Sequence, residues 1–272
     1  MLTIPQTLNV QAGVAIDKVA GLKKPGRFMI SGMLAGLYMG VGVVLMVSSA
    51  GPLLAAGDGF AKLVSGLVFG AALTLTVFAG ADLGTSAMMI LPLGVLMKSV
   101  KPGRASATLG FICLANALGA LVFGSLIVAS GVLVSNSAAG AMLSDMLASK
   151  AHESPLELFT RGILCNVLVC LAIWMGSRVE SDGTKIALIF IAITAFIASG
   201  FEHVIANMTT YTIGILSGDP NGTLALYGYN VLWVGLGNLV GGAVVVALAY
   251  WVVGGRPQVS NRATLPTEAR IY

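Results

Sequence analysis

Two ionisable residues stand side by side in a long apolar stretch of this sequence. Glu202 and His203 interrupt "IASGFEHVIANM" (197–208), and Asn207 follows shortly after them. Ionisable side chains are costly inside a membrane and are functional sites by default. Histidine is the side chain that exchanges protons near neutral pH. We therefore predict a polar site in which His203 faces the substrate and Glu202 braces the backbone. The alternative is a buried pair that only ties helices together.

A second apolar stretch is interrupted in a similar way at "GADLGTSAMM" (80–89). Asp82 breaks the apolar run, Gly84 permits a turn, and Thr85 adds a hydroxyl. A half-helix that starts after such a break directs its N-terminal N–H groups at a cavity, and so does one that starts near Asn207. Two positive helix ends that face one cavity suit an anion.

Bulky apolar residues are expected around both interruptions, namely Phe69, Leu73, Leu83 and Phe196. Packing in a core or against lipid is the alternative role for each of them. Oriented amides, a hydroxyl and a histidine between apolar rings predict a site for a small, largely dehydrated monovalent anion. His203 could lend a proton to a weak-acid anion, which would then cross the constriction as a neutral acid.

The sequence does not favour a metal, a cofactor or an enzyme. His203 is the one histidine inside an apolar segment, and no second ligand stands at metal-binding spacing from it. No GxxxxGK[ST] nucleotide-binding loop occurs. An enzyme with His203 as its base would need a nucleophile or metal nearby. A neutral-solute pore of aquaporin type is a further alternative, but the sequence lacks the paired Asn-Pro-Ala motifs of that class.

The elements that must position these residues are membrane helices. The 272 residues are 57% hydrophobic and 10% charged, with a mean hydropathy of +0.92, whereas soluble domains carry about 25% charged residues. A helix needs about 20 apolar residues to cross a bilayer. We expect an all-α membrane protein with six spans, of which the second and fifth are broken: 28–49, 63–97, 107–134, 158–177, 186–218 and 229–253.

The positions of the basic residues predict the orientation of these spans. Six spans place both termini on one side, together with 12 of the 15 Lys and Arg; Lys62, Lys150 and Arg161 lie on the other side. The basic side is expected to be cytoplasmic, and the net charge of +4 then reflects this loop bias and not nucleic-acid binding. We predict a cytoplasmic N-terminal segment (1–27), which could act as a gate, a channel domain (28–253) and a cytoplasmic tail (254–272).

An internal repeat relates the two broken spans. Residues 80–89 align with 200–209, and 112–121 with 234–243. The matched pairs are Gly80 with Gly200, Asp82 with Glu202, Met88 with Met208, and Asn116 with Asn238. A repeat of three spans must be inserted upside down in its second copy. The sequence therefore predicts an inverted 3+3 repeat, an architecture of channels and secondary transporters, with Asp82, Gly84, Asn116, Asn238 and Glu202 as structural residues at the breaks.

Residues 10–253 resemble the formate/nitrite transporter family. Three motifs carry the resemblance: "AGADLGTS" (79–86), "GILCNVLVCLAIWM" (162–175) and "ASGFEHVIANM" (198–208). The resemblance implies an aquaporin-like protomer of six helices in a homopentamer of separate pores, in a bacterial cytoplasmic membrane. It makes His203 the central histidine and Thr85 its partner, and it places Phe69, Leu73, Leu83 and Phe196 in the constrictions.

The same resemblance assigns three more residues to the pathway. Asn166 and Asn207 match polar residues near the pore, and Lys150 matches a periplasmic basic residue that draws in anions, unless it is only a solvated surface lysine. The family usually carries a bulky Phe or Ile where this chain has Gly84. The stretch "GYNVLWVGLGN" (228–238) is more similar to the nitrite branch than to the formate branch. We expect nitrite as the substrate, with formate, lactate or hydrosulfide as alternatives, by passive flow or with protons.

Overall fold

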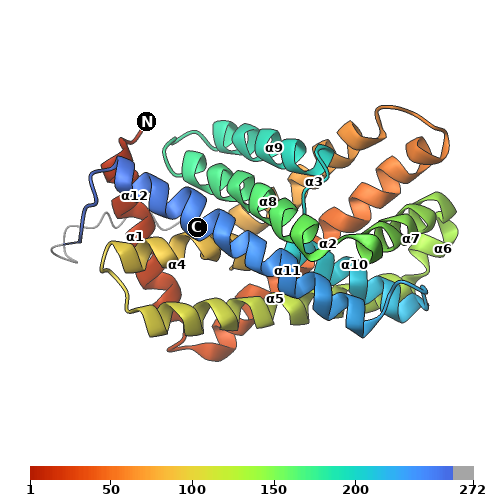
Figure 1. Ribbon diagram of the computed structural model, residues 1–272, viewed down its shortest axis with the longest axis horizontal. Coiled ribbons are helices and arrows are strands. Elements are labelled where there is room, and N and C mark those ends of the chain that lie inside the picture. The colour runs from red at the N-terminus through yellow and green to blue at the C-terminus, as the bar shows by residue number, and fades with distance from the viewer. Residues whose placement is uncertain (260–272) are drawn as a thin grey trace.

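The computed structural model describes residues 1–259, and every regular element in that range is a helix (Figure 1). Five stretches are long and apolar enough to cross a membrane: α2, α3, α5, α8 and the continuous helix Leu224–Val253. The prediction of an all-α chain with several membrane helices is therefore confirmed. The elements are α1 (Ile4–Gly21), α2 (Pro25–Ala55), α3 (Ala61–Phe78), α4 (Gly84–Leu96), α5 (Pro102–Ser130), α6 (Val132–Ser135), α7 (Ser137–His152), α8 (Pro155–Gly176), α9 (Asp182–Ala198), α10 (Val204–Ser217), α11 (Leu224–Val240), the π-helix η1 (Gly241–Leu248) and α12 (Ala249–Val253).

The chain leaves helical geometry at both predicted interruptions. Residues 79–83 separate α3 from α4, and residues 199–203 separate α9 from α10. Gly80 and Gly200 both have a φ of +75°, a left-handed conformation that glycine adopts without steric cost. Each break therefore turns at a glycine and ends at the first residue of a short apolar helix.

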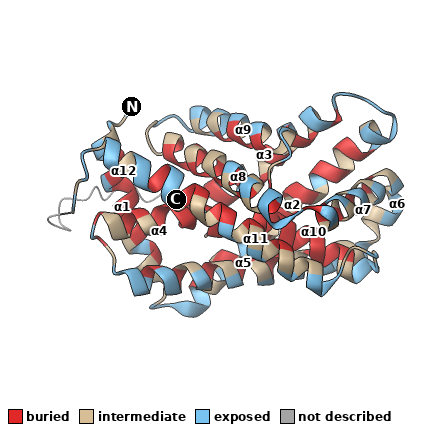
Figure 2. Ribbon diagram, in the orientation of Figure 1, coloured by how far each residue is buried: buried red, intermediate tan, exposed pale blue. Residues whose placement is uncertain are grey.

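The two short helices lie at the centre of the molecule. Most residues of α4 and α10 are buried, and Figure 2 shows the exposed residues on the outer helix faces. α10 packs against α2, α5 and α11, and α4 packs against α1, α5, α8 and η1. The surrounding helices thereby hold both breaks inside protein, where irregular backbone at membrane depth is tolerated.

Some predicted helix boundaries are wrong by several residues. α5 begins at Pro102 and ends at Ser130, where Gly131 takes a φ of +67°, whereas the apolar pattern predicts 107–134. α8 begins at Pro155, before the predicted 158, because Ser154 and Glu157 form a capping box. The helices α6 and α7 are not in the prediction at all, because the charge-free run 105–144 conceals the turn at Gly131.

The N-terminal helix α1 packs against the body of the protein. Leu8 and Ala15 are fully buried, and α1 contacts both α4 and α12. Gly94 of α4 lies so close to Ala15 that a Cβ atom there would be 2.5 Å from the Ala15 Cβ. The segment 1–27 is therefore a docked helix followed by the start of α2. Of the predicted tail 254–272, residues 260–272 lie outside the described range.

Candidate functional site

A hydrogen bond joins the two breaks at the centre of the fold. Thr85 Oγ1 lies 3.0 Å from His203 Nε2, although the residues are 118 positions apart. Both side chains are buried. His203 is also the N-cap of α10, where its Nδ1 accepts the N–H of Ala206 at 3.2 Å. Because an Nδ1 that accepts carries no proton, the neutral ring has its proton on Nε2 and donates it to the Thr85 hydroxyl.

Two asparagines hold the breaks with matching sets of hydrogen bonds. Asn116 Oδ1 accepts the N–H of Gly84 at 2.8 Å, and its Nδ2 donates to the carbonyls of Gly32 and Asp82, both at 2.8 Å. The Asn116 side chain thus binds three backbone groups at the first break.

Asn238 makes the equivalent contacts at the second break. Its Oδ1 accepts the N–H of Val204 at 2.9 Å, and its Nδ2 donates to the carbonyls of Gly162 at 2.8 Å and Glu202 at 2.9 Å. Consequently the first N–H of each short helix is occupied by an asparagine. These two N–H groups therefore serve the broken backbone and are not free to bind an anion.

Each acidic residue in a break is paired with a buried lysine. Lys18 Nζ lies 2.6 Å from Asp82, whose carboxylate also accepts the Ser31 hydroxyl at 2.8 Å. Lys150 Nζ lies 2.5 Å from both carboxylate oxygens of Glu202. Buried charges in proteins are stabilised by such partners. The solvated-surface alternative for Lys150 is wrong, since the residue is only 7% exposed.

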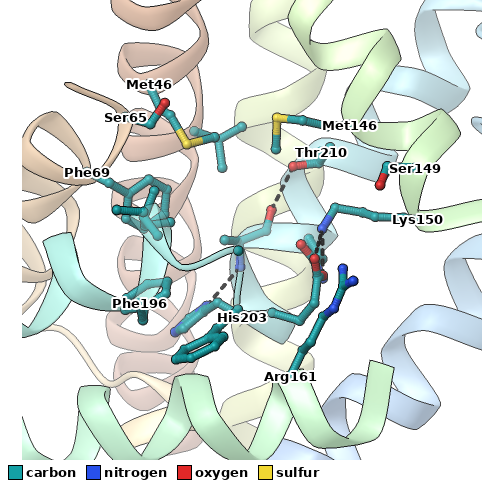
Figure 3. A pocket seen from close by; sticks show the side chains of 18 of the residues that line it. Met46, Ser65, Phe69, Met146, Ser149, Lys150, Arg161, Phe196, His203 and Thr210 are labelled. Atoms are coloured by element: carbon teal, nitrogen blue, oxygen red, sulfur yellow. Dashed lines mark hydrogen bonds and ion pairs between the residues drawn. The ribbon is translucent and has the colours of Figure 1, made fainter. Parts of the chain in front are cut away.

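A cavity of about 320 Å³ reaches His203 from one side (Figure 3). Phe69, Phe196 and His203 lie together on one side of the lining, opposite Lys150 and Arg161 (Figure 3), with Phe196 stacked on the imidazole at 6.0 Å between ring centroids. Its charged lining residues comprise three bases and two acids, for a net charge of +1: Lys62, Lys150, Arg161, Glu153 and Glu202. The cavity lining is therefore weakly positive, and one side of it is aromatic.

A second ion pair in the lining of this cavity joins Arg161 and Glu153. Burial and the negative charge of Glu202 raise the pKa of Glu153, while Lys150 and Arg161 oppose this shift. The net result is a raised pKa, so Glu153 is easier to protonate than an ordinary surface carboxyl.

A second, much smaller cavity of about 20 Å³ lies beyond the breaks. Leu73 and Leu83 line it together with the Ser86 and Lys18 side chains. Phe69 and Phe196 line the first cavity but not this one. The four predicted apolar residues thus form two pairs, each lining a different cavity.

The two predicted pathway asparagines have different positions. Asn207 lines the larger cavity and donates to Glu202 Oε2 at 2.6 Å and to Asn230 Oδ1 at 2.9 Å. Asn166 lines neither cavity. Its Nδ2 donates to the Thr85 carbonyl at 3.1 Å and to the Asn238 carbonyl at 2.7 Å, so Asn166 supports Thr85 from behind.

Sequence reasoning missed several residues of this site, chiefly Lys18, Ser31, Glu153 and Asn230. A signal for Lys18 was present, because a carboxylate in an otherwise apolar segment, such as Asp82, requires a basic or donor partner. The sequence contains 15 candidate Lys and Arg, and nothing local selects Lys18 among them. Within residues 1–259, no group of three or more His, Cys, Asp or Glu could hold a metal.

Residues 6–252 match the model of a family described as "Formate/nitrite transporter". The nitrite transporter NirC of Escherichia coli K12 is 39% identical over 228 residues, which cover 84% of this chain and 83% of that protein. The formate channel FocA of the same strain is 30% identical over 253 residues, which cover 85% and 87%.

Two solved structures share the fold. An "FNT family ion channel" superposes with a TM-score of 0.84 at 35% identity, covering 91% of this chain and 98% of that chain. A "Pentameric formate channel with formate bound" superposes with a TM-score of 0.73 at 27% identity, covering 85% and 98%.

Proposed function

The chain belongs to the formate/nitrite transporter family, and we propose that it is a membrane channel for small monovalent anions, with nitrite as its main substrate. The observation that carries this proposal is the Thr85–His203 hydrogen bond, which lies between two apolar constrictions at the end of a weakly positive cavity. A polar pair of this kind offers a dehydrated anion its hydrogen-bond donors at the middle of the pathway. The relatives compared are transporters and channels, not enzymes.

The charged mouth collects the anion. Lys62 and Arg161 line the larger cavity, and the paired Lys150 and Glu202 lie deeper within it. A net positive cleft with low-dielectric walls raises the local concentration of anions. Because Lys150 is paired with Glu202, it binds an anion less tightly than a free lysine would. The anion can therefore pass on into the pore.

Phe69 and Phe196 then strip water from the anion, and His203 replaces part of that water. The proton on Nε2, which is donated to Thr85, is in place to donate to an anion instead. Leu73 and Leu83 form the second barrier before the smaller cavity. The pathway runs from the mouth past Asn207 to these leucines, and Asn166 positions Thr85.

Proton transport is a finer part of the proposal. Transfer of a proton from His203 to a weak-acid anion requires an imidazolium, which has protons on both ring nitrogens. The second proton on Nδ1 displaces the hydrogen bond from Ala206. The anion takes the Nε2 proton and leaves as a neutral acid, and the ring keeps its proton on Nδ1. The hydrogen bond from Ala206 forms again only after Nε2 takes up a proton and Nδ1 loses one. Proton symport is expected to be slower than entry of the anion into the cavity for this reason.

Formate is the second candidate substrate. FocA is a formate channel with 30% identity to this chain, and a "Probable formate transporter" of Methanothermobacter thermautotrophicus is 36% identical over 262 residues. Nitrite is preferred because NirC shares a larger fraction of identical residues. Lactate and hydrosulfide remain alternatives, since neither cavity presents a group that would exclude a small weak acid.

The same proposal includes the membrane architecture. The matching contacts of Asn116 and Asn238, and of Asp82 and Glu202, support an inverted repeat of three plus three spans. We place both termini in the cytoplasm, because the basic loops cluster there. The pentameric state of one solved relative supports a homopentamer, embedded in the lipid of a bacterial inner membrane.

Anion flux into proteoliposomes tests the proposed function. Purified protein is given nitrite, formate, lactate, hydrosulfide and nitrate at equal concentrations, with an internal pH dye. We expect nitrite to enter fastest and to acidify the interior. Equal entry of all weak acids would replace nitrite selectivity with general weak-acid transport, and no flux of any anion would refute the channel.

A further inference from the structure

A large cavity lies outside the proposed anion pathway. It has a volume of about 660 Å³ and lies between α4, α5 and the helix Leu224–Val253. α4 packs against both α5 and η1 and forms the floor of the groove; the three are neighbours in Figure 1. The lining is apolar except for one hydroxyl, that of Ser106, and includes Pro92, Leu96, Leu109, Ala243 and Leu248.

This groove is open space that no side chain of the described residues fills. Gly110 of α5 lines it, and a Cβ atom added at Gly110 would meet no heavy atom within 4 Å. Leu248 on the opposite wall is 37% exposed. Contiguous exposed apolar surface of this kind marks a ligand, lipid or protein contact.

Basic residues stand at one end of the groove. Lys98, Lys101 and Arg104 are exposed, and the residues directly after the last two, Pro102 and Ala105, line the groove. Within residues 1–259, none of the three bases takes part in an ion pair. An apolar groove that ends at unpaired positive charge matches a molecule with a hydrocarbon part and an anionic part.

We propose that this groove holds an acyl chain of an anionic membrane phospholipid, whose phosphate group lies on Lys101 and Arg104. Basic sites between membrane helices recognise anionic head groups, and burial of the chain contributes through the hydrophobic effect. A helix from a second copy of this chain is the competing occupant, and the variants below distinguish it from a lipid. The proposal requires only that the protein is membrane-embedded, so its outcome is independent of which anion the pore conducts.

Lipid retention by the intact assembly tests this site. The full-length protein is reconstituted in nanodiscs of phosphatidylglycerol or phosphatidylcholine with identical acyl chains, released, and weighed by native mass spectrometry. We expect the wild type to retain phosphatidylglycerol and to retain phosphatidylcholine much more weakly. Each basic side chain near an anionic lipid contributes about fivefold in affinity, so Lys101→Gln/Arg104→Gln should lose at least tenfold.

Matched variants separate this site from general effects of charge and bulk. Gly110→Trp fills the groove and should abolish retention, whereas Gly228→Trp adds the same side chain at another exposed helix glycine with nothing within 4 Å and should retain lipid. Lys23→Gln/Lys24→Gln removes an equal charge from another exposed basic pair and should also retain it. If Gly110→Trp does not fold, Ala243→Leu narrows the same groove from the other wall.

Two results would overturn the proposal. One is equal retention of the two lipids by the wild type and by the Lys101→Gln/Arg104→Gln variant. The other is dissociation of the oligomer by Gly110→Trp, measured by light scattering, which would identify a second copy of the chain as the occupant.

Discussion

Asn116 and Asn238 hold the two helix breaks through the same three kinds of hydrogen bond: one from the first N–H of a short helix and two to carbonyls. The residues lie on α5 and α11, and both are fully buried. Neither side chain lines the proposed pathway. Their common task is to satisfy backbone groups that a broken helix would leave unpaired at membrane depth, where each unsatisfied group is costly.

Asn116→Ala and Asn238→Ala should destabilise the protein to a similar extent. Each removes the partner of the first N–H of a short helix and of one carbonyl in the break, and an unsatisfied buried group costs about 1–3 kcal/mol. The thermal unfolding midpoint in detergent measures the effect, at one fixed scan rate. Asn9→Ala, at an exposed position of α1, serves as the control. If Asn116→Ala or Asn238→Ala were as stable as Asn9→Ala, the proposed structural role of that asparagine would be contradicted.

Breaking the Lys150–Glu202 pair should destabilise the protein more than removing it. Glu202→Gln leaves a buried lysine unpaired, which costs about 3–5 kcal/mol for buried pairs. The double variant Lys150→Met/Glu202→Gln should recover part of that loss. A double-mutant cycle based on unfolding midpoints measures the interaction free energy between Lys150 and Glu202.

The pair of Lys185 with Asp182, whose carboxylate is exposed, is the control for that cycle. Asp182→Asn should change stability by less than about 1 kcal/mol, as expected for a surface ion pair. A Glu202→Gln protein as stable as Asp182→Asn would show that the buried pair is not structural.

Removal of the donors at the centre should reduce anion flux without unfolding the protein. His203→Phe keeps an aromatic ring against Phe196 but removes both nitrogens, and we expect it to abolish proton-coupled uptake of weak-acid anions. Thr85→Val should lower flux by about fivefold, which corresponds to one hydrogen bond of about 1 kcal/mol, and Thr85→Ser should preserve it.

Flux and internal pH in proteoliposomes check both variants. Thr74→Val is a matched control, because the Thr74 hydroxyl bonds only the Gly70 carbonyl of its own helix. Normal acidification by well-folded His203→Phe protein would remove the central role of this histidine.

Glu153 should make stability depend on pH. Its raised pKa means that the folded protein binds more protons at this site than the unfolded chain does. Its contribution to the free energy of unfolding therefore falls as the pH rises from about 4, the ordinary range of a carboxyl. Glu153→Gln should gain stability relative to wild type between acidic and neutral pH.

Unfolding midpoints across that pH range measure the difference. Glu180→Gln, at an exposed position between α8 and α9, should run parallel to the wild type. A Glu153→Gln curve that also stays parallel would contradict the shift.

The sequence by itself determined the class of protein, the main apolar helices and the positions of both breaks. A membrane helix satisfies its own backbone hydrogen bonds, so its length and apolar composition suffice to predict it. The positions of the breaks could also be predicted from local sequence, because Asp82 and the Glu202–His203 pair interrupt otherwise apolar runs. The pairing of Thr85 with His203 was available only from the resemblance to a known family.

Only the tertiary structure decided which distant residues meet. Lys18 is 64 positions from Asp82, and Lys150 is 52 positions from Glu202, and no periodicity connects residues so far apart. The helix α7, which brings Lys150 to its acid, was not predicted, because the turn at Gly131 that precedes it lies in a charge-free run. Local patterns report how each segment is solvated, whereas the partner of a buried charge depends on how all the helices pack together.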